Sequence, residues 1–235
     1  MDADRMDYLL RDSYHAGVQY GRFDLRRLRG TIRAIPGTRD RAARLGISQG
    51  GAHAAEGLVL ARYFMFTQVY FHKTRVAYDL HLRGALKELL PGGRFPSPAG
   101  DQIDGFLRWD DWRVLGLLAH GKGGEHGDRL ARRNHYRRIY ATPETCTEND
   151  LQVLDRVKEK LGPILQAEES AGKSWYKTGK PDIPVVSSLN ERDVLPLSHH
   201  STMIANLRAN NQVLLYAKPQ DVEQASTLIG EVTKL

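Results

Sequence analysis

The stretch Met1–Gly17, MDADRMDYLLRDSYHAG, predicts a helix with two unlike faces. Asp2 is a good N-cap and Gly17 is a typical residue just beyond a helix C-terminus. At about 100° per residue, the polar side chains that share one face are Asp4, Tyr8, Arg11, Asp12 and His15. The side chains that share the opposite face are Met6, Leu9, Leu10 and Ser13. We therefore expect one side to pack and the other to present acids, a phenol and cations.

The polar face has the residue types of a ligand-binding surface. Asp4, Tyr8 and Asp12 stand one turn apart, which places a possible metal-binding carboxylate, a ring and a second acceptor in one row. Arg5 and Arg11 flank this row as donors suited to phosphate. The alternative is a solvated amphipathic face with Asp/Arg pairs, and periodicity alone is compatible with both interpretations.

The string DADRMDYLLRD, residues 2–12, closely resembles a signature of the HD-domain phosphohydrolases. The most similar subgroup is the deoxynucleoside triphosphate triphosphohydrolases, in which a metal-activated water releases triphosphate from a dNTP. The resemblance implies that Asp4 is the last ligand of the metal site. It also implies that Arg5 contacts substrate phosphate and that Tyr8 and Asp12 contact the sugar.

The other metal ligands of that family are a histidine and an adjacent His-Asp dyad, which lie upstream of the signature. None of the nine histidines of this sequence is followed by aspartate. One carboxylate cannot hold a transition metal by itself. We therefore expect an incomplete site for a divalent ion (Mn, Mg, Co, Fe or Zn), and we expect the chain to correspond to the C-terminal part of such an enzyme.

A second stretch, residues 56–75 with the sequence EGLVLARYFMFTQVYFHKTR, resembles another characteristic segment of the same family. It lies inside a helical pattern that runs from about residue 52 to residue 90 and ends before Pro91. His72 falls in the apolar line of this pattern, where a lone histidine is usually a hydrogen-bonded core residue. The resemblance instead implies that His72 contacts the triphosphate or the sugar.

Residues 22–44 hold eight arginines against two aspartates and no lysine. Such a run is ordinarily a solvated or intersubunit face. Sites that bind phosphate or carboxylate through two parallel hydrogen bonds also favour arginine over lysine. Arg26, Arg27 and Arg29 are therefore candidate anion or regulatory contacts. The same region predicts a short helix capped by Asp24 and a hairpin of residues 31–35 and 44–48.

The composition is that of an ordinary globular protein: 235 residues, 41% hydrophobic and 26% charged. The sequence has no apolar run long enough for a membrane helix and no signal-peptide layout, so we expect no membrane association and a cytoplasmic location. The single cysteine, Cys146, excludes an internal disulfide. The net charge of +6 favours anionic partners such as deoxynucleotides.

We predict a mainly α-helical fold with a smaller C-terminal α+β subdomain. Residues 1–135 form the helical part, an HD-type core that is incomplete at its N-terminus, and include the hairpin. Residues 136–235 form the α+β subdomain, with an antiparallel sheet. The strands expected in this sheet are residues 136–142, 183–187 and 212–217. The helices expected beside it are residues 149–161 and 220–230.

The leading functional hypothesis is the C-terminal part of an HD-type dNTP triphosphohydrolase. It would act as a homo-oligomer or together with a complementing HD-containing segment. The alternative is a non-catalytic nucleotide-binding or regulatory subunit that pairs with an HD-containing chain. A nucleic-acid-binding module is the least favoured hypothesis, because no basic patch interleaved with aromatic residues is present.

Overall fold

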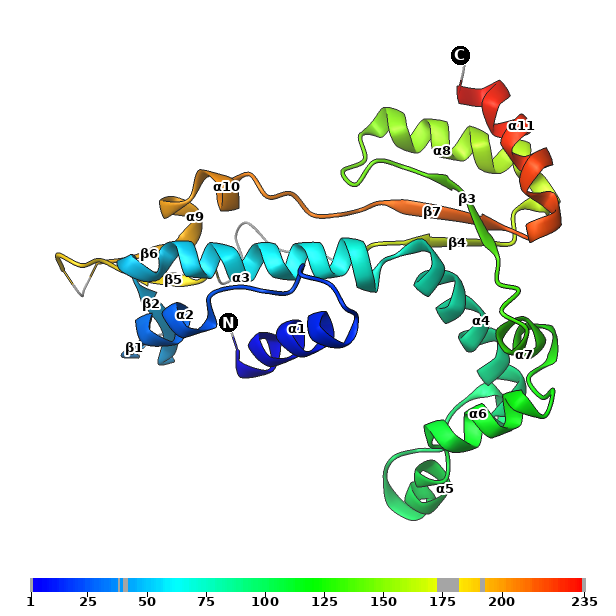
Figure 1. The fold of residues 1–235 in the computed structure, drawn as a ribbon, viewed down its shortest axis with the longest axis horizontal. Coiled ribbons are helices and arrows are strands. Elements are labelled where there is room, and N and C mark those ends of the chain that lie inside the picture. The colour runs from blue at the N-terminus through cyan, green and yellow to red at the C-terminus, as the bar shows by residue number, and fades with distance from the viewer. Residues whose placement is uncertain (1, 38, 40–41, 173–181, 191–192, 234–235) are drawn as a thin grey trace. The chain divides into compact units, whose positions relative to one another are not determined.

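The computed structural model of the protein describes residues 2–37, 39, 42–172, 182–190 and 193–233 (Figure 1). Its internal contacts divide the chain into two units that each combine two segments of sequence. Unit 1 consists of Met1–His72 and Ala171–Asn211, and unit 2 consists of Lys73–Ser170 and Gln212–Leu235. Most elements are helices and two small sheets accompany them, which confirms the predicted fold class. The predicted division after residue 135 does not follow these units, because strand pairing joins segments that are distant in sequence.

Unit 1 contains the N-terminal elements and a short C-terminal set. Its helices are α1 (Ala3–His15), α2 (Leu25–Thr31), α3 (Ala52–Met65), α9 (Leu197–His200) and α10 (Thr202–Ala205), with a 3₁₀ turn at Gln49–Gly51 and a π-helix at Phe66–Tyr70. Its strands are β1 (Ile32–Ile35), β2 (Arg44–Ser48), β5 (Pro184–Val186) and β6 (Val194–Pro196). Among the described residues, no helix combines the length and apolar character needed to cross a lipid bilayer.

The local predictions for the first two helices are confirmed. The Asp2 side chain accepts a hydrogen bond from the backbone N–H of Arg5 (2.8 Å) at the start of α1. The Asp24 side chain accepts one from the N–H of Arg27 (2.8 Å) at the start of α2. Gly17 has a φ of 68°, the left-handed conformation that favours glycine just beyond a helix end.

The four-stranded sheet of unit 1 has the order β1-β2-β5-β6. The β1–β2 hairpin is antiparallel as predicted, with Ile32 opposite Ile47. Strand β5 pairs in parallel with β2. The prediction that residues 183–187 belong to the C-terminal antiparallel sheet was therefore wrong, because β5 finds its partner in the N-terminal hairpin.

The core of unit 1 holds α1 against α3. Leu9 is completely buried in a cluster that also contains Leu28, Ile47 and Met65, and Met6 packs at its edge. Ser13 fixes the turn after α1, because its hydroxyl donates to the carbonyl of Val18 (2.6 Å) and accepts from a backbone N–H nearby (3.2 Å). The buried Leu9 and Ser13 confirm which face of α1 packs.

The long helix predicted from residue 52 to residue 90 is interrupted. Helix α3 passes into the π-helix, where the N–H of Phe71 bonds to the carbonyl of Phe66 (2.6 Å), and α4 (Lys73–Leu89) begins two residues later. His72 lies in this break and is exposed. The interpretation of His72 as a core histidine was therefore wrong, since the wider π turn changes which side chains face the core.

Unit 2 begins with α4. Its other helices are α5 (Ile103–Leu107), α6 (Asp111–Ala119), α7 (Gly124–Ala131), α8 (Glu148–Leu161) and α11 (Val222–Thr233), with 3₁₀ turns at Pro91–Gly93, Gly100–Gln102, Gly162–Ile164 and Pro219–Asp221. Its strands are β3 (Arg137–Ala141), β4 (Ala167–Ser170) and β7 (Val213–Ala217).

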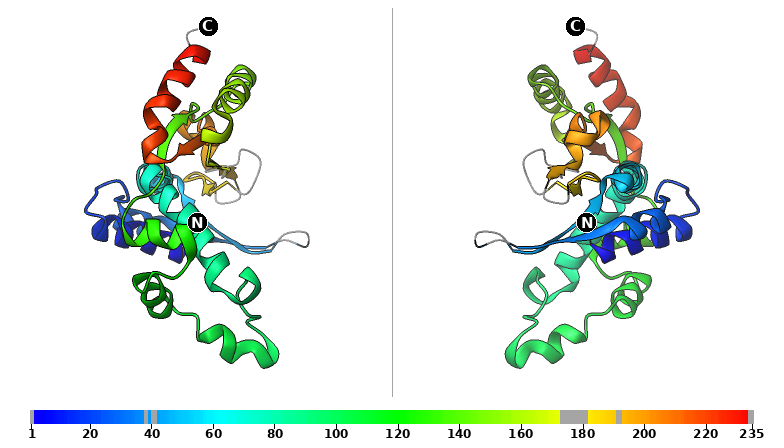
Figure 2. Two further views of the ribbon diagram at one scale, coloured as in Figure 1. Left: turned by 90° about the vertical axis from the view of Figure 1, so that its right-hand side faces the viewer. Right: turned by 90° about the vertical axis from the view of Figure 1, so that its left-hand side faces the viewer.

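The sheet of unit 2 has the order β3-β7-β4, and both pairings are antiparallel. All five residues of the central strand β7 are buried, as its uninterrupted apolar sequence indicates. Helices α8 and α11 lie next to each other and share an apolar cluster with β7 (Figure 2). The predicted antiparallel α+β arrangement thus exists, but β4 and not β5 is its third strand.

Candidate functional site

The structure brings two of the predicted site residues together with a tyrosine that the sequence analysis did not select. Tyr8 and Asp12 lie one turn apart on α1 and are both half-buried. The hydroxyl of Tyr70 donates a hydrogen bond to Oδ2 of Asp12 (2.6 Å). The rings of Tyr8 and Tyr70 make an edge contact, with centroids 6.3 Å apart and planes at 66°. These three residues are called the Tyr8–Asp12–Tyr70 cluster below.

The other predicted residues of α1 lie nearer to solvent. Asp4 is exposed, and Nε of Arg5 lies 3.3 Å from Oδ2 of Asp2. Further along the helix, Arg11 forms an ion pair with Asp7. The face therefore carries exposed Asp/Arg pairs beside a half-buried cluster of two tyrosines and an aspartate.

The described residues do not fit a metal ion. None of them form a group of three or more His, Cys, Asp or Glu side chains that could hold one. Asp4 belongs to no such group among the described residues, and a single exposed carboxylate does not retain a transition metal.

His72 and the arginines occupy exposed positions of unit 1. His72 follows Tyr70 by two residues, and its backbone N–H bonds to the carbonyl of Val69 (3.4 Å). Arg26, Arg27 and Arg29 are exposed on α2. The guanidinium of Arg27 donates to the carbonyl of Gly50 (2.9 Å), so this arginine ties α2 to the segment that leads into α3.

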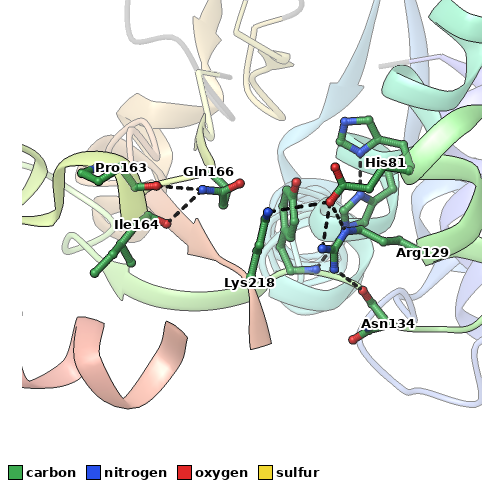
Figure 3. A network of polar contacts seen from close by, with 10 residues as sticks. His81, Arg129, Asn134, Pro163, Ile164, Gln166 and Lys218 are labelled. Carbon is green, nitrogen blue, oxygen red and sulfur yellow. Dashed lines mark hydrogen bonds and ion pairs between the residues drawn. The ribbon is translucent and has the colours of Figure 1, made fainter. Parts of the chain in front are cut away.

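Unit 2 contains a polar network around a completely buried histidine of α4, His81 (Figure 3). Nε2 of His81 accepts a hydrogen bond from the backbone N–H of Tyr136 (3.0 Å), and Nδ1 lies 2.8 Å from Nδ1 of His126. Because an acceptor nitrogen cannot carry the proton of a neutral imidazole, we assign the proton of His81 to Nδ1, which donates to His126. Sequence reasoning missed His81, although it occurs at helical spacing between buried Ala77 and Ala85.

Burial keeps the His81 imidazole neutral. It lowers the pKa of His81 to about 4, and the neighbouring His126, Arg129 and His135 act in the same direction. Arg129 bonds to Oε1 of Glu125 (2.9 and 3.0 Å) and to the carbonyl of Asn134 (3.1 Å; Figure 3). The network joins α4, α7 and the segment that leads into β3, and we interpret it as structural support within unit 2.

The chain is similar to proteins of one family. The family model described as HD associated region matches residues 24–167. Two curated relatives are uncharacterized proteins. The one from Methanocaldococcus jannaschii is 43% identical over 90 residues, which are 38% of this chain and 20% of the relative. The one from Bacillus subtilis is 47% identical over 72 residues, which are 31% of this chain and 15% of the relative.

Two solved structures share the fold. A hypothetical protein from Aquifex aeolicus is 30% identical with a TM-score of 0.77, and the match covers 96% of this chain and 56% of that chain. A phosphohydrolase from Bacteroides thetaiotaomicron is 22% identical with a TM-score of 0.62, and the match covers 92% of this chain and 61% of that chain. The chain thus spans less than two thirds of each of these proteins.

Proposed function

The chain belongs to the HD associated region family, and from this premise we propose that it provides substrate-binding residues to an HD-type phosphohydrolase that acts on deoxynucleoside triphosphates. The observation that carries the proposal is the half-buried Tyr8–Asp12–Tyr70 cluster, whose Tyr8 and Asp12 lie on the same helix as Asp4 and Arg5. The fold that the chain shares with the phosphohydrolase from Bacteroides thetaiotaomicron supports the hydrolase class.

Each residue has a role that its chemistry allows. The Arg5 guanidinium is a donor for a phosphate oxygen. The Tyr8 ring offers an apolar face and a phenol to the sugar, and the Asp12 carboxylate accepts a hydrogen bond from a sugar hydroxyl. His72, exposed beyond the π-helix, supplies an imidazole to the triphosphate or the sugar. Asp4 adds one carboxylate to a metal site whose histidine ligands come from an HD-containing segment.

A second candidate function is a non-catalytic nucleotide-binding subunit that regulates an HD-containing chain, alone or within a homo-oligomer. Two observations favour it: the described residues lack a metal-binding group, and Arg26 and Arg29 are exposed on α2. The two functions differ in whether changes at Tyr8 and Asp4 lower turnover in the assembled enzyme or alter only its regulation.

We expect the isolated 235-residue chain to hydrolyse no dNTP at a measurable rate, because Asp4 alone does not retain a metal. The assay measures triphosphate release with manganese, magnesium or cobalt. The Asp4→Asn variant is the control for contaminating activity. Metal-dependent release that Asp4→Asn abolishes would contradict the prediction and show that fewer ligands suffice.

In an assembly that contains the HD segment, we expect Tyr8→Ala and His72→Ala each to lower kcat/KM by about tenfold to a few hundredfold, since a lost substrate contact costs about 1 to 3 kcal/mol. Their metal content should not change. Asp4→Asn should lower metal content and activity together, because it removes a ligand charge. Metal analysis and turnover of one dNTP at saturating metal test both statements.

The matched control is Tyr14→Ala, because Tyr14 lies on the same helix and is 75% exposed. It should leave turnover and metal content unchanged. Normal turnover of His72→Ala would remove His72 from the site, and normal turnover of Tyr8→Ala would refute the proposed sugar contact.

A further inference from the structure

We propose that a groove of unit 2, between α4, α6 and α7, is where a second copy of this chain docks, with Trp112 as its anchor. The groove has a volume of about 590 Å³, within the range of pockets that bind ligands. Its apolar lining includes Leu82 of α4, Leu115 of α6 and Leu130 of α7. These residues are separate from those assigned to the nucleotide in unit 1.

The walls of the groove are held in place by contacts around His81 (Figure 3). Helices α4 and α7 approach closely at Gly84, where a Cβ atom would lie 2.2 Å from the ring of His126. The hydrogen bond between His81 and His126 joins the same two helices. A Cβ atom at Gly127 of α7 would lie 3.3 Å from a methyl carbon of Leu118, so α6 also packs on α7. Because the groove is formed in the single chain, docking requires little reorganisation.

Large apolar side chains are exposed on α6 at the edge of the groove. Trp112 is 83% exposed and Leu115 is 58% exposed. They are three positions apart on the helix and therefore share one face. Exposed apolar patches mark interaction sites, and tryptophan is enriched among the few residues that dominate binding energy. Trp112 is therefore suited to anchor a partner.

The groove and its anchor lie on the same helix, which is the arrangement of a two-fold symmetric contact. In such a contact both copies offer the same surface, so Trp112 of each copy enters the groove of the other. A buried indole needs an acceptor for its N–H. Asp79 lines the groove, and its carboxylate, paired through Oδ2 with Arg75 (3.0 Å), has a second oxygen that can accept this hydrogen bond.

Charges of opposite sign flank the anchor and the groove. Asp111 is exposed in the first turn of α6 and precedes Trp112. Arg132 follows Ala131, which lines the groove, and the Arg132 side chain is 78% exposed. When Trp112 enters the groove of a second copy, Asp111 therefore approaches Arg132 of that copy. The surface is thus complementary to itself in charge as well as in shape.

Sedimentation of the 235-residue chain across micromolar concentrations should show a monomer–dimer equilibrium. Trp112→Ala should weaken the dimer about thirtyfold or more, the effect of losing a central anchor. Tryptophan emission should shift to shorter wavelength as the dimer forms, and Trp112→Phe should remove most of this shift. Leu151→Ala is the matched control, because Leu151 is 44% exposed on α8 of the same unit, and it should keep the wild-type dimer.

Charge reversal tests how the two copies pair. Asp111→Arg and Arg132→Asp should each weaken self-association about tenfold, because each variant places like charges opposite one another at two symmetric positions. An equimolar mixture of the two variants should dimerise like the wild type, since every pair then joins opposite charges. Failure of the mixture to dimerise would overturn this pairing of the copies.

A wild-type dimer that Trp112→Ala leaves unchanged would overturn the proposal. A wild-type chain that stays monomeric would also overturn it. If such a monomer binds an apolar dye and Leu115→Glu abolishes the binding, the groove receives a molecule other than a second copy.

Discussion

Replacing Leu9 with alanine should lower the free energy of unfolding of unit 1 by about 2 to 5 kcal/mol. The Leu9 side chain has no exposed surface and packs in the main core cluster of unit 1. Alanine removes its apolar contacts and leaves a cavity that a close-packed core fills only in part. Urea unfolding of the wild type and the variant measures the difference.

This substitution also tests how α1 presents its polar face. Because Leu9 holds the helix on the core, Leu9→Ala should weaken dATP binding although Leu9 itself is too deeply buried to contact a ligand. Leu45→Ala is the matched control, since Leu45 belongs to the same unit and is 53% exposed, and its effect should stay within about 0.5 kcal/mol. Equal destabilisation by both variants would contradict the burial of Leu9 in the core of unit 1.

Acid should destabilise unit 2 by about 3 kcal/mol through His81 alone. The unfolded imidazole has a pKa of 6.5, and burial lowers the pKa of folded His81 to about 4. Below pH 6.5 the unfolded chain therefore binds a proton that the folded chain excludes. Above pH 6.5 His81 is neutral in both states and does not lower the free energy of unfolding. As the pH falls from 6.5 towards 4, the free energy of unfolding decreases. The loss should appear as a lower protection factor of the Tyr136 amide, its exchange rate compared with that of an unfolded peptide at the same pH, because this N–H bonds to His81.

The variant His81→Gln separates this effect from the general response to acid. A glutamine oxygen can accept the Tyr136 N–H but does not titrate, so the variant should be less stable at pH 7.5 and less sensitive to pH below 6.5. His120→Gln is the control, because His120 is exposed in unit 2 and its loss should keep the wild-type pH dependence. A wild-type pH dependence in His81→Gln would contradict the assignment.

Several features of the protein were determined by sequence alone because they depend on residues a few positions apart. Asp2 and Asp24 bond to N–H groups three residues later, so the starts of α1 and α2 could be predicted. The spacing of apolar residues gave the buried face of α1, and the uninterrupted apolar run of residues 213–217 gave a buried strand. The mainly helical fold with a smaller α+β part follows from the same local patterns.

Other features were decided only by the tertiary structure, because they join residues that are distant in sequence. The apolar pattern continues through residues 66–70, so it gave no sign of the π turn that exposes His72. Strand β5 is too short and apolar to specify its neighbour, and its parallel pairing with β2 is set by the core of unit 1. The contacts of Tyr70 with Asp12 and of His81 with Tyr136 span 58 and 55 positions. Local propensity acts within about one helical turn, whereas such contacts form only when burial of the whole core brings the segments together.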